Sequence, residues 1–421
     1  MFTFRRFNAV PAILVAAAVL AVAGCGTTEA GPSQSVGTTI DVDALLGPIN
    51  KATGTPIKIG FVYEGKTAGL DTTKIAAGFH ASVQYANERL GGINGHEIQV
   101  DECSTENTPS GATKCGIQMV NDEVAAVLVP ASAQDAGIFD AISSANAGIP
   151  YFTYLAAAQD IMIKPGGYLL VNPIATVAAP AKIAHDDGVK KAAIIVVDVP
   201  AATGPLTAIA EPLFKKAGVE LDVVPISTQT ADMTPQVQQA ISDGAEQIAV
   251  VGNDEFVGNA IKTVKQLGFD GKVVMVTAPS QVVIDAVGEG GLDGVVYVTS
   301  STEDPDDPDV KVYRAAMQTY MKDTVPDAQS AWSYALVVGL VDALKTSPDA
   351  IDAASVAKGL GSMPAPLPLP LGGGLTYQCG AKLVALLPNS CTDNALTTTL
   401  DAKGHGQGYQ KLDVRDYLTV G

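Results

Sequence analysis

The chain has 421 residues, of which 47% are hydrophobic and only 17% are charged. It is therefore long enough for two packed domains and too apolar to be intrinsically disordered. The formal net charge is −18 at pH 7 and no cluster of Lys and Arg stands out, which excludes nucleic acid as an expected partner because the phosphate backbone would be repelled.

The start of the chain predicts export and lipidation. Two arginines precede an apolar run at residues 10–22, which is too short for a comfortable membrane span, and small residues then lead to Cys25. This pattern is typical of a bacterial lipoprotein signal peptide over residues 1–24, with Cys25 lipidated as the mature N-terminus. The alternative is an ordinary secretory signal whose cleavage site ends near a cysteine. Residues 25–55, rich in Gly, Thr, Ser and Pro, are predicted to be a tether.

The stretch 57–101 predicts a strand, a loop, a helix, a turn and a second strand. The apolar run at residues 57–62 fits a buried strand, and the helix after it has one apolar face at helical spacing. Asp71 or Thr72 is expected to cap the helix at its start. Gly91 and the glycine after it end the helix, because glycine adopts the left-handed conformation at little cost. The apolar face comprises Ile75, Phe79, Val83, Ala86 and Leu90.

The second strand of this unit is predicted at residues 97–101. A strand-helix-strand unit of this length crosses over right-handed into a parallel sheet. Ligands bind such sheets where the strands end and the loops begin. The loop at residues 63–71 is therefore the first expected part of a ligand site.

The same stretch resembles the leucine/isoleucine/valine-binding proteins of bacterial ABC importers, which belong to the periplasmic binding protein type I family. The resemblance is carried by the strand, the Gly-containing loop, the helix ending in Asn87-Glu88, and the turn Gly91-Gly92-Ile93-Asn94-Gly95. It covers nearly all of the chain after Thr55. It implies an α/β fold with two doubly wound lobes joined by a three-strand hinge.

In that family the chain passes between the lobes three times, and the lobes close on a ligand like a hinged clamp. We place these passages near Asn172, Ser300 and Gly373. The expected domains are residues 56–173 with 301–372 for lobe 1, and residues 174–300 with 373–421 for lobe 2.

The rest of the chain alternates between strand and helix patterns, as doubly wound sheets require. Two helices are expected after an acidic loop at residues 300–309, and the single tryptophan, Trp332, lies in the second of them in an apolar row typical of core packing. Short strands are expected near residues 381–387 and 410–413. Further strands are expected at 124–129, 149–154, 192–197, 221–225, 247–251, 272–277 and 294–299, and helices at 112–121, 136–147, 178–187, 205–217, 234–243, 255–267, 281–287, 310–322 and 329–345.

Five cysteines are an odd number, and lipidation of Cys25 leaves four. An exported protein folds in an oxidising compartment, so two disulfides are expected. Three pairings are possible. The local pairing, Cys103 with Cys115 and Cys379 with Cys391, is favoured because each pair brackets a short, turn-rich stretch.

No pattern in the chain indicates catalysis. It contains no G-x-S-x-G elbow, no H-E-x-x-H helix and no Walker loop. No cysteine pair has the spacing of a zinc site, and the four histidines are scattered. We therefore expect no enzyme activity, no metal and no cofactor.

The loops at the strand ends of lobe 1 offer small residues, which let a ligand reach backbone N–H groups at helix starts. Such N–H groups favour an anion or a carboxylate, and the hydroxyl of Ser132 is the best single candidate for an added hydrogen bond. The alternative is that these segments are only tight turns. The candidates in lobe 1 are Leu70, Asp71, Ala131, Ser132, Ala156 and Ala157.

In lobe 2 the candidates are Ala202, Asp254 and Pro279. Amino-acid binders of the family usually have a Tyr in the first of these loops and an acid near the third. This chain has small residues and proline at both places, with Asp254 as a possible substitute for the acid. The resemblance therefore leaves open a more apolar carboxylate or another small metabolite as the ligand.

Together these patterns predict a lipid-anchored substrate-binding protein at the extracytoplasmic face of the cell membrane. It would capture an amino acid or a related small carboxylate or amide by hinge closure. The expected partners are the permease and ATPase subunits of an ABC transporter, and the protein is expected to be a monomer. The alternatives are a ligand-sensing receptor of similar fold without a transport role, and an exported enzyme on that fold.

Overall fold

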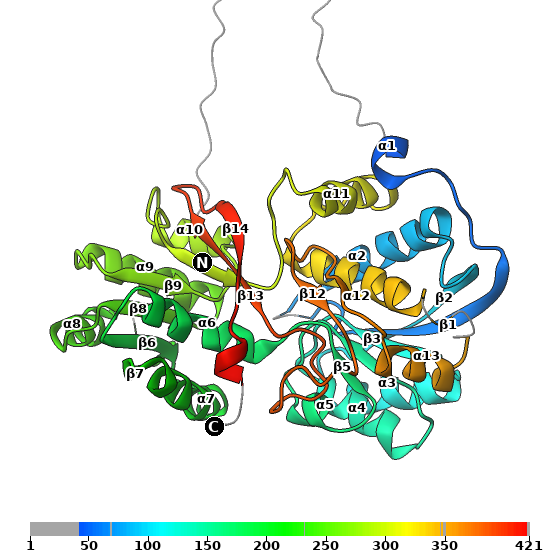
Figure 1. The fold of residues 1–421 in the computed structure, drawn as a ribbon, viewed down its shortest axis with the longest axis horizontal. Coiled ribbons are helices and arrows are strands. Elements are labelled where there is room, and N and C mark those ends of the chain that lie inside the picture. The colour runs from blue at the N-terminus through cyan, green and yellow to red at the C-terminus, as the bar shows by residue number, and fades with distance from the viewer. Residues whose placement is uncertain (1–41, 68–69, 231, 346, 348–350, 419–421) are drawn as a thin grey trace, which may run out of the picture. The chain divides into compact units, whose positions relative to one another are not determined.

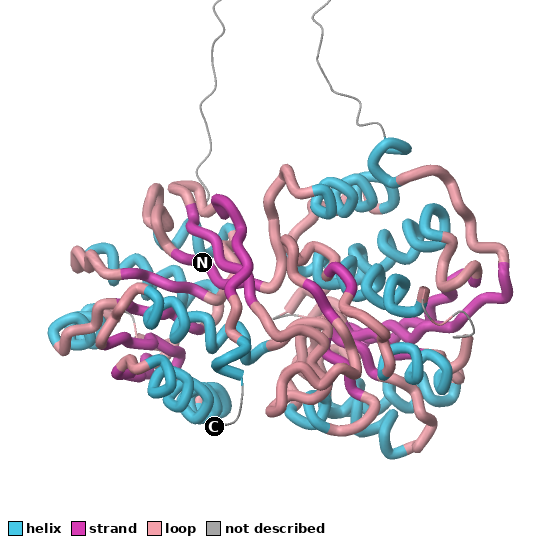
Figure 2. The backbone as a smooth tube through the Cα atoms, in the orientation of Figure 1, coloured by secondary structure: helices cyan, strands magenta, loops and turns pink. Residues whose placement is uncertain are grey.

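The computed structural model describes residues 42–418 except 68–69, 231, 346 and 348–350. These residues form two lobes, each built on its own sheet (Figure 1). Figure 2 shows the strands of each sheet flanked by helices. The predicted α/β fold of two doubly wound lobes is therefore confirmed. No helix within the described residues is long and apolar enough to cross a membrane.

The first lobe is built on a parallel five-stranded sheet of order β2-β1-β3-β4-β5. Its strands are β1 (Gly54–Tyr63), β2 (His96–Ser104), β3 (Ala126–Val129), β4 (Tyr151–Thr153) and β5 (Gly167–Leu169). Side chains alternate between the two faces of a strand. Ile59 and Phe61 of β1 thus pack in one core with Phe79 and Leu336, whereas Val62 packs in the core on the other face.

Helices cover both faces of the first sheet. Phe79 belongs to α2 and Leu336 to α12, and the opposite core contains residues of α3 and α4. Helix α11 packs beside α2. The helices of this lobe are α1 (Val42–Leu46), α2 (Thr73–Tyr85) with a π-helical continuation at Ala86–Leu90, α3 (Pro109–Asn121), α4 (Asp135–Ser144), α5 (Gln159–Ile163), α11 (Pro308–Tyr320), α12 (Ala328–Leu344) and α13 (Ala353–Gly361).

The starts of α2 and α12 lie against each other. A Cβ atom on Gly78 would meet the backbone oxygen of Ser330 at 2.4 Å, so only glycine permits this approach. The hydroxyl of Ser333 donates to the backbone oxygen of Ile75 at 2.8 Å. The predicted end of α2 is also correct, since Gly91 adopts the left-handed conformation there.

The second lobe is built on a seven-stranded sheet of order β14-β13-β10-β9-β8-β6-β7, in which β13 is antiparallel to β10 and β14 to β13. Ile194 and Val196 of β6 face the core that contains residues of α6 and α7, and Ala193 and Ile195 face the core that contains residues of α8, α9 and α10. The elements are β6 (Lys191–Val197), β7 (Glu220–Ile226), β8 (Gln247–Val251), β9 (Lys272–Met275), β10 (Val296–Thr299), β13 (Ala395–Leu400), β14 (Gly406–Leu412), α6 (Pro173–Asp186), α7 (Pro200–Ala217), α8 (Thr234–Ser242), α9 (Asp254–Gln266), α10 (Gln281–Val287) and the 3-10 turn Arg415–Leu418.

The chain passes from the first sheet to the second after β5, and from the second sheet back to the first lobe after β10. At the first passage, Asn172 caps α6 by accepting hydrogen bonds from the N–H groups of Ile174 and Ala175. At the second passage, the N–H of Thr302 donates to the backbone oxygen of Leu371 at 2.7 Å.

The third passage lies later than the predicted Gly373. Tyr377 and Cys391 are buried in the core of the first lobe, whereas Ala395 is buried in a core of the second lobe. Val384 and Leu387, which lie between Tyr377 and Cys391, pack in the second-lobe core, and Leu396 packs in the first-lobe core, so the segment 384–396 contacts both lobes. We propose that the boundary between the lobes lies at the start of β13. The sequence placed it too early because the glycines near 373 mark only the turn between two short paired strands, β11 (Leu367–Pro368) and β12 (Thr376–Tyr377).

The end of the predicted tether is part of the first lobe. Leu46 is buried in a core with residues of α2 and α11. The N–H groups of Asn50 and Ala52 donate to the backbone oxygens of Glu88 and Asn87. The predicted signal peptide, the lipidated Cys25 and the tether up to residue 41 lie outside the described residues.

Most departures from the predicted elements fall near the C-terminus. Residues 381–387 form turns and irregular backbone instead of the expected strand, within the loop that a disulfide closes. The strand expected near 410–413 is β14, which begins earlier, and β13 and α13 were not predicted. In the second lobe, α7 begins at Pro200 rather than at residue 205, because proline is well tolerated in the first turn of a helix.

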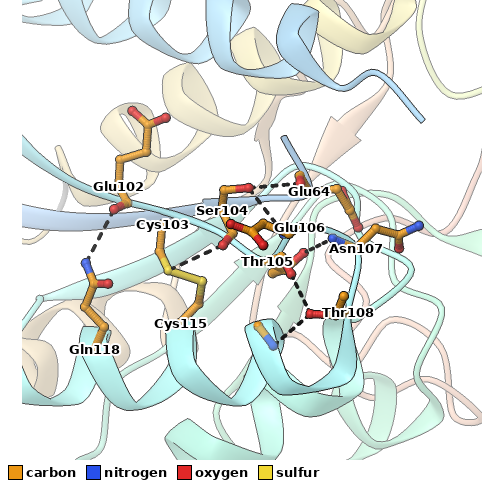
Figure 3. Close-up of a disulfide and its surroundings, with 11 residues drawn as sticks. Glu64, Glu102, Cys103, Ser104, Thr105, Glu106, Asn107, Thr108, Cys115 and Gln118 are labelled. Atoms are coloured by element: carbon orange, nitrogen blue, oxygen red, sulfur yellow. Dashed lines mark hydrogen bonds between the residues drawn. A yellow bond between two sulfur atoms is a disulfide. The ribbon is translucent and has the colours of Figure 1, made fainter. Parts of the chain in front are cut away.

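Both predicted disulfides are present and both belong to the first lobe. Cys103 at the end of β2 is bonded to Cys115 of α3, as Figure 3 shows. Cys379 is bonded to Cys391, just before the third passage. Each bridge spans a sequence separation of 12 residues, so the local pairing favoured by the sequence is confirmed.

Candidate ligand-binding site

The carboxyl ends of the parallel strands in the first sheet meet at one edge, which we call the first-lobe edge. It comprises the loops at residues 64–72, 104–108, 130–134 and 154–158, which follow β1, β2, β3 and β4. All six candidate residues of lobe 1 lie in these loops. Each loop leads toward a helix start, the place where backbone N–H groups lack partners within the helix.

The loop after β1 is held closed by its own polar groups. The backbone oxygen of Leu70 accepts hydrogen bonds from the N–H and the hydroxyl of Thr67. Asp71 pairs with Lys66 at 2.7 Å and accepts hydrogen bonds from the N–H and hydroxyl of Thr73 at the start of α2. The Lys66 ammonium, followed by the Thr73 hydroxyl and N–H, holds the pKa of Asp71 below its usual value. Both charged side chains are largely exposed.

The loop after β3 contains the best single candidate from the sequence, Ser132. Its side chain is mostly buried, and its Oγ accepts a hydrogen bond from the N–H of Gln134 at 3.0 Å. The N–H of the next residue, Ala133, donates to the Oε1 atom of Glu64 at 2.8 Å. Glu64 follows β1 directly, so its carboxylate joins the first loop to the third.

The loop after β4 is held in the same way. The N–H groups of Ala157 and Ala158 donate to Oδ2 of Asp135 at 2.7 and 3.2 Å. Asp135 is the first residue of α4, immediately after the loop that contains Ser132. Two carboxylates of the chain therefore accept N–H groups that the sequence analysis had assigned to a bound anion.

Glu64 and Asp135 are buried, each with a side chain only 2% exposed. Tyr151 is fully buried close to both, and its hydroxyl is without a hydrogen-bond partner among the described residues. Burial raises the pKa of Asp135, although the N–H bonds from Ala157 and Ala158 oppose this. Burial also raises the pKa of Tyr151 well above its ordinary value. The uncharged hydroxyl of Tyr151 and the buried carboxyl groups of Glu64 and Asp135 therefore lie close together at the first-lobe edge.

Glu64 and Asp135 were not among the predicted site residues, because the prediction rested on small residues in the loops. A usable signal was present: an acid directly after a buried strand, and an acid at the first position of the following helix. Buried carboxylates need hydrogen-bond donors, and free N–H groups at loop ends are the nearest supply.

An aromatic pair lies beside the loop after β4. Trp332, near the start of α12, stacks on Tyr154 with ring centroids 6.2 Å apart. Trp332 is half-buried, so part of the indole remains accessible. The apolar row that contains Trp332 was predicted to be typical of core packing, and Trp332 does pack against the core of the first lobe while it stacks on Tyr154 at the start of the loop after β4.

The three candidates of lobe 2 lie at the carboxyl edge of the second sheet, which we call the second-lobe edge. Asp254 is half-buried, and its Oδ2 accepts a hydrogen bond from the hydroxyl of Ser280 at 2.5 Å. This bond joins the loop after β8 to the loop after β9, which contains Pro279. Ala202 lies in the first turn of α7 rather than in a loop.

Helix caps at the second-lobe edge come from uncharged side chains. Asn253 caps α9 by accepting from the N–H of Phe256, and Ser280 caps α10 by accepting from the N–H of Val283. The described residues contain no group of three or more His, Cys, Asp or Glu that is arranged to hold a metal ion.

A model of the periplasmic binding protein family matches residues 56–383. The chain therefore belongs to this family, whose members bind solutes. A comparison with curated proteins found no match.

Solved structures of similar fold cover most of this chain and nearly all of their own. A putative branched-chain amino acid ABC transporter protein from Rhodospirillum rubrum is 16% identical, with a TM-score of 0.69 over 85% of this chain and 100% of that one. The substrate-binding protein LivJ from Streptococcus pneumoniae, in complex with isoleucine, is 15% identical, with a TM-score of 0.63 over 85% and 99%. A solute-binding protein from R. palustris, in complex with benzoate, is 15% identical, with a TM-score of 0.61 over 85% and 96%.

Proposed function

We propose that this protein is the extracytoplasmic substrate-binding protein of an ABC importer. It captures a small molecule, an amino acid or a related small carboxylate or amide, between its two lobes by hinge closure. The main support is the architecture. Two sheets with separate cores are joined by three passages of the chain, and each sheet has polar loops at its carboxyl edge. The proteins of similar fold that were solved with isoleucine and benzoate support a small organic ligand.

Closure follows from a ligand that touches both edges. A ligand shifts a two-state equilibrium only by the difference in its affinity for the two states. Contacts with the first-lobe edge alone are equal in the open and closed forms, whereas added contacts with Asp254 or Ser280 exist only in the closed form. The closed form then docks on the permease subunits, with the ATPase on the cytoplasmic side. In this proposal Cys25 carries the lipid that keeps a monomeric binding protein at the membrane.

A thermal-shift screen with amino acids, small carboxylates and their amides tests ligand capture, because binding to the folded state raises the melting temperature by mass action. Compounds that bind are then examined by small-angle scattering, which should show a smaller radius of gyration with ligand than without. Identical scattering profiles with and without a compound that binds would contradict hinge closure. Failure to co-purify any permease with the lipidated protein would favour a sensor that uses the same clamp.

A further inference from the structure

The first-lobe edge already contains two anions of its own. Glu64 accepts the N–H of Ala133, and Asp135 accepts the N–H groups of Ala157 and Ala158, with N···O distances between 2.7 and 3.2 Å. The donors of these bonds lie in the loops after β3 and β4, the two loops whose small residues were predicted to offer N–H groups to a ligand. The two carboxylates thus stand where an anionic ligand group would otherwise find its donors.

Among the residues that the structure describes, no cation is paired with these two acids. Within the described residues, neither Glu64 nor Asp135 has a Lys, Arg or His nitrogen within ion-pair distance, whereas the more exposed Asp71 at the same edge is paired with Lys66. The buried hydroxyl of Tyr151 is close to both acids and has no hydrogen-bond partner in the part of the chain that the structure describes. A charge buried at low dielectric acts on its neighbours far more strongly than one in water.

We propose that Glu64 and Asp135 are positioning residues that fix the loops of the first-lobe edge, and that this edge accepts an uncharged or cationic ligand group, such as an amide or an ammonium, and not a carboxylate. The proposal rests on the proposed function, because it concerns the ligand that the two lobes share. It reverses the polarity that the sequence analysis expected for the small-residue loops.

Two physical effects act in the same direction. A ligand carboxylate at this edge would meet two like charges that are themselves shielded from water, and like charges at short range disfavour the ionised form. It would also lack the N–H donors that such a group needs, because three of them are already bonded. A neutral amide needs fewer donors from the protein, and it carries no negative charge that the buried carboxylates would repel. Within the described residues the hydroxyl of Ser132 accepts a hydrogen bond from the N–H of Gln134 and donates none to the protein, so its proton can be donated to an amide oxygen of the ligand.

The positioning role is tested without any ligand, by hydrogen exchange followed by mass spectrometry on the ligand-free protein. Asp135→Ala should speed exchange in peptides that cover residues 155–159 by about tenfold or more, since an opened hydrogen bond removes protection. Asp135→Asn keeps an acceptor oxygen and should restore most of the protection. The matched control is Asp140→Ala, an exposed acid on the same helix, which should leave these peptides unchanged. Fast exchange of residues 155–159 in the unmodified protein would overturn the positioning role.

The ligand class is tested with matched probes that differ only in charge: benzamide with benzoate, isobutyramide with isobutyrate, and leucinamide with leucine. Titration calorimetry should give an amide affinity at least about tenfold above that of the matching carboxylate. In Glu64→Gln and Asp135→Asn, which keep the acceptors and remove one charge each, this ratio should fall severalfold. A purely structural role of the two acids would change both affinities together and leave the ratio unaltered.

Tighter binding of a carboxylate than of its amide overturns the ligand class, and so does a ratio that neither charge-removing variant alters. A failure of the proposed function has a different signature. In that case no probe binds or reduces the radius of gyration, while the exchange protection at residues 155–159 is intact. That outcome would contradict both the proposed ligand class and ligand capture by hinge closure. The exchange measurement alone would then decide whether the two acids position the loops.

Discussion

The two lobes are built on the same plan but fasten their ligand loops by different means. At the first-lobe edge, buried Glu64 and Asp135 hold the loops after β3 and β4 through backbone N–H groups. At the second-lobe edge, half-buried Asp254 holds a hydroxyl, and the helix caps are Asn253 and Ser280. Both disulfides belong to the first lobe, and the second lobe has none of the four paired cysteines.

This difference assigns different tasks to the lobes. Loops tied by buried charge and by covalent bridges are preorganised, so a ligand that binds there loses little free energy to ordering them. The loops after β8 and β9 are joined through hydroxyl groups, by Ser280 to Asp254 and by Thr277 to the backbone oxygen of Gly252. Loops joined in this way, without a buried carboxylate, can adjust to a ligand when the lobes close. We therefore expect the first lobe to select the chemical group at one end of the ligand, and the second lobe to respond to its presence.

Among the predicted changes, loss of the disulfides should give the largest difference in stability between the two lobes. Because each bridge closes a loop of similar length, the loop-entropy model gives about 3 kcal/mol for each. Replacing Cys103 and Cys115 by Ser should therefore lower the free energy of unfolding of the first lobe by about that amount. Replacing Cys379 and Cys391 by Ser should lower the free energy of unfolding by a similar amount. Differential scanning calorimetry with and without reductant measures the loss.

The second lobe provides the internal control for that experiment. Hydrogen exchange in peptides from β6 and β8 should be nearly unaffected by the Ser replacements, while peptides from β2 and α3 exchange faster. Equal loss of protection in both lobes would show that they unfold as one cooperative unit, and the contrast in preorganisation would then not hold at equilibrium.

Truncation of an acid at each edge should give the next largest effect. Asp135→Ala leaves two N–H groups at a buried site without an acceptor, which costs about 2–3 kcal/mol in stability. Asp254→Ala removes one bond to a hydroxyl at a half-exposed site and should cost under about 1 kcal/mol. Chemical denaturation of the two variants measures the difference. Equal losses would contradict the view that the two edges are fastened differently.

The sequence predicted the architecture well because strand and helix periodicity repeats over many residues. The position of the first passage near Asn172 came from the family resemblance and not from a local pattern, and Asn172 caps α6 in the structure. The prediction misplaced the third passage at Gly373 because glycine marks a turn whether the chain then leaves the lobe or stays. Only the burial of Tyr377 and Cys391 in the first core distinguishes these cases.

The candidate loops were predicted from the sequence, whereas the polarity of the ligand group is the point at which our proposal departs from the sequence-based expectation. Small residues such as Ala133 and Ala157 mark loops at a sheet edge, and those positions proved to be at the edge. Whether their N–H groups are free depends on contacts between residues far apart in the sequence, such as Glu64 with Ala133. No local pattern encodes such a contact, so the expected anion site could be judged only from the fold.

Acid titration should give the smallest effect, with opposite signs in the two lobes. In the second lobe, the Arg415 guanidinium lowers the pKa of Asp413 to about 2. The unfolded chain therefore binds a proton first, and the stability from this pair is lost as pH falls from about 4 toward 2. Because the Asp413 side chain is 47% exposed, solvent screening limits the effect to under about 1 kcal/mol.

In the first lobe the sign reverses, because burial raises the pKa of Asp135 above its unfolded value. The folded protein then binds the proton first, and the stability that the protonated form contributes is lost as pH rises through the raised pKa. As pH falls through the raised pKa of Asp135, the unmodified protein should gain stability relative to Asp135→Asn. As pH falls from about 4 toward 2, it should lose stability relative to Asp413→Asn. Melting temperatures of the three proteins between pH 3 and 7 test both signs, with Asp140→Asn as the exposed-acid control. If the melting temperatures of Asp135→Asn and Asp413→Asn changed with pH in the same way, the two acids would not have pKa values shifted in opposite directions.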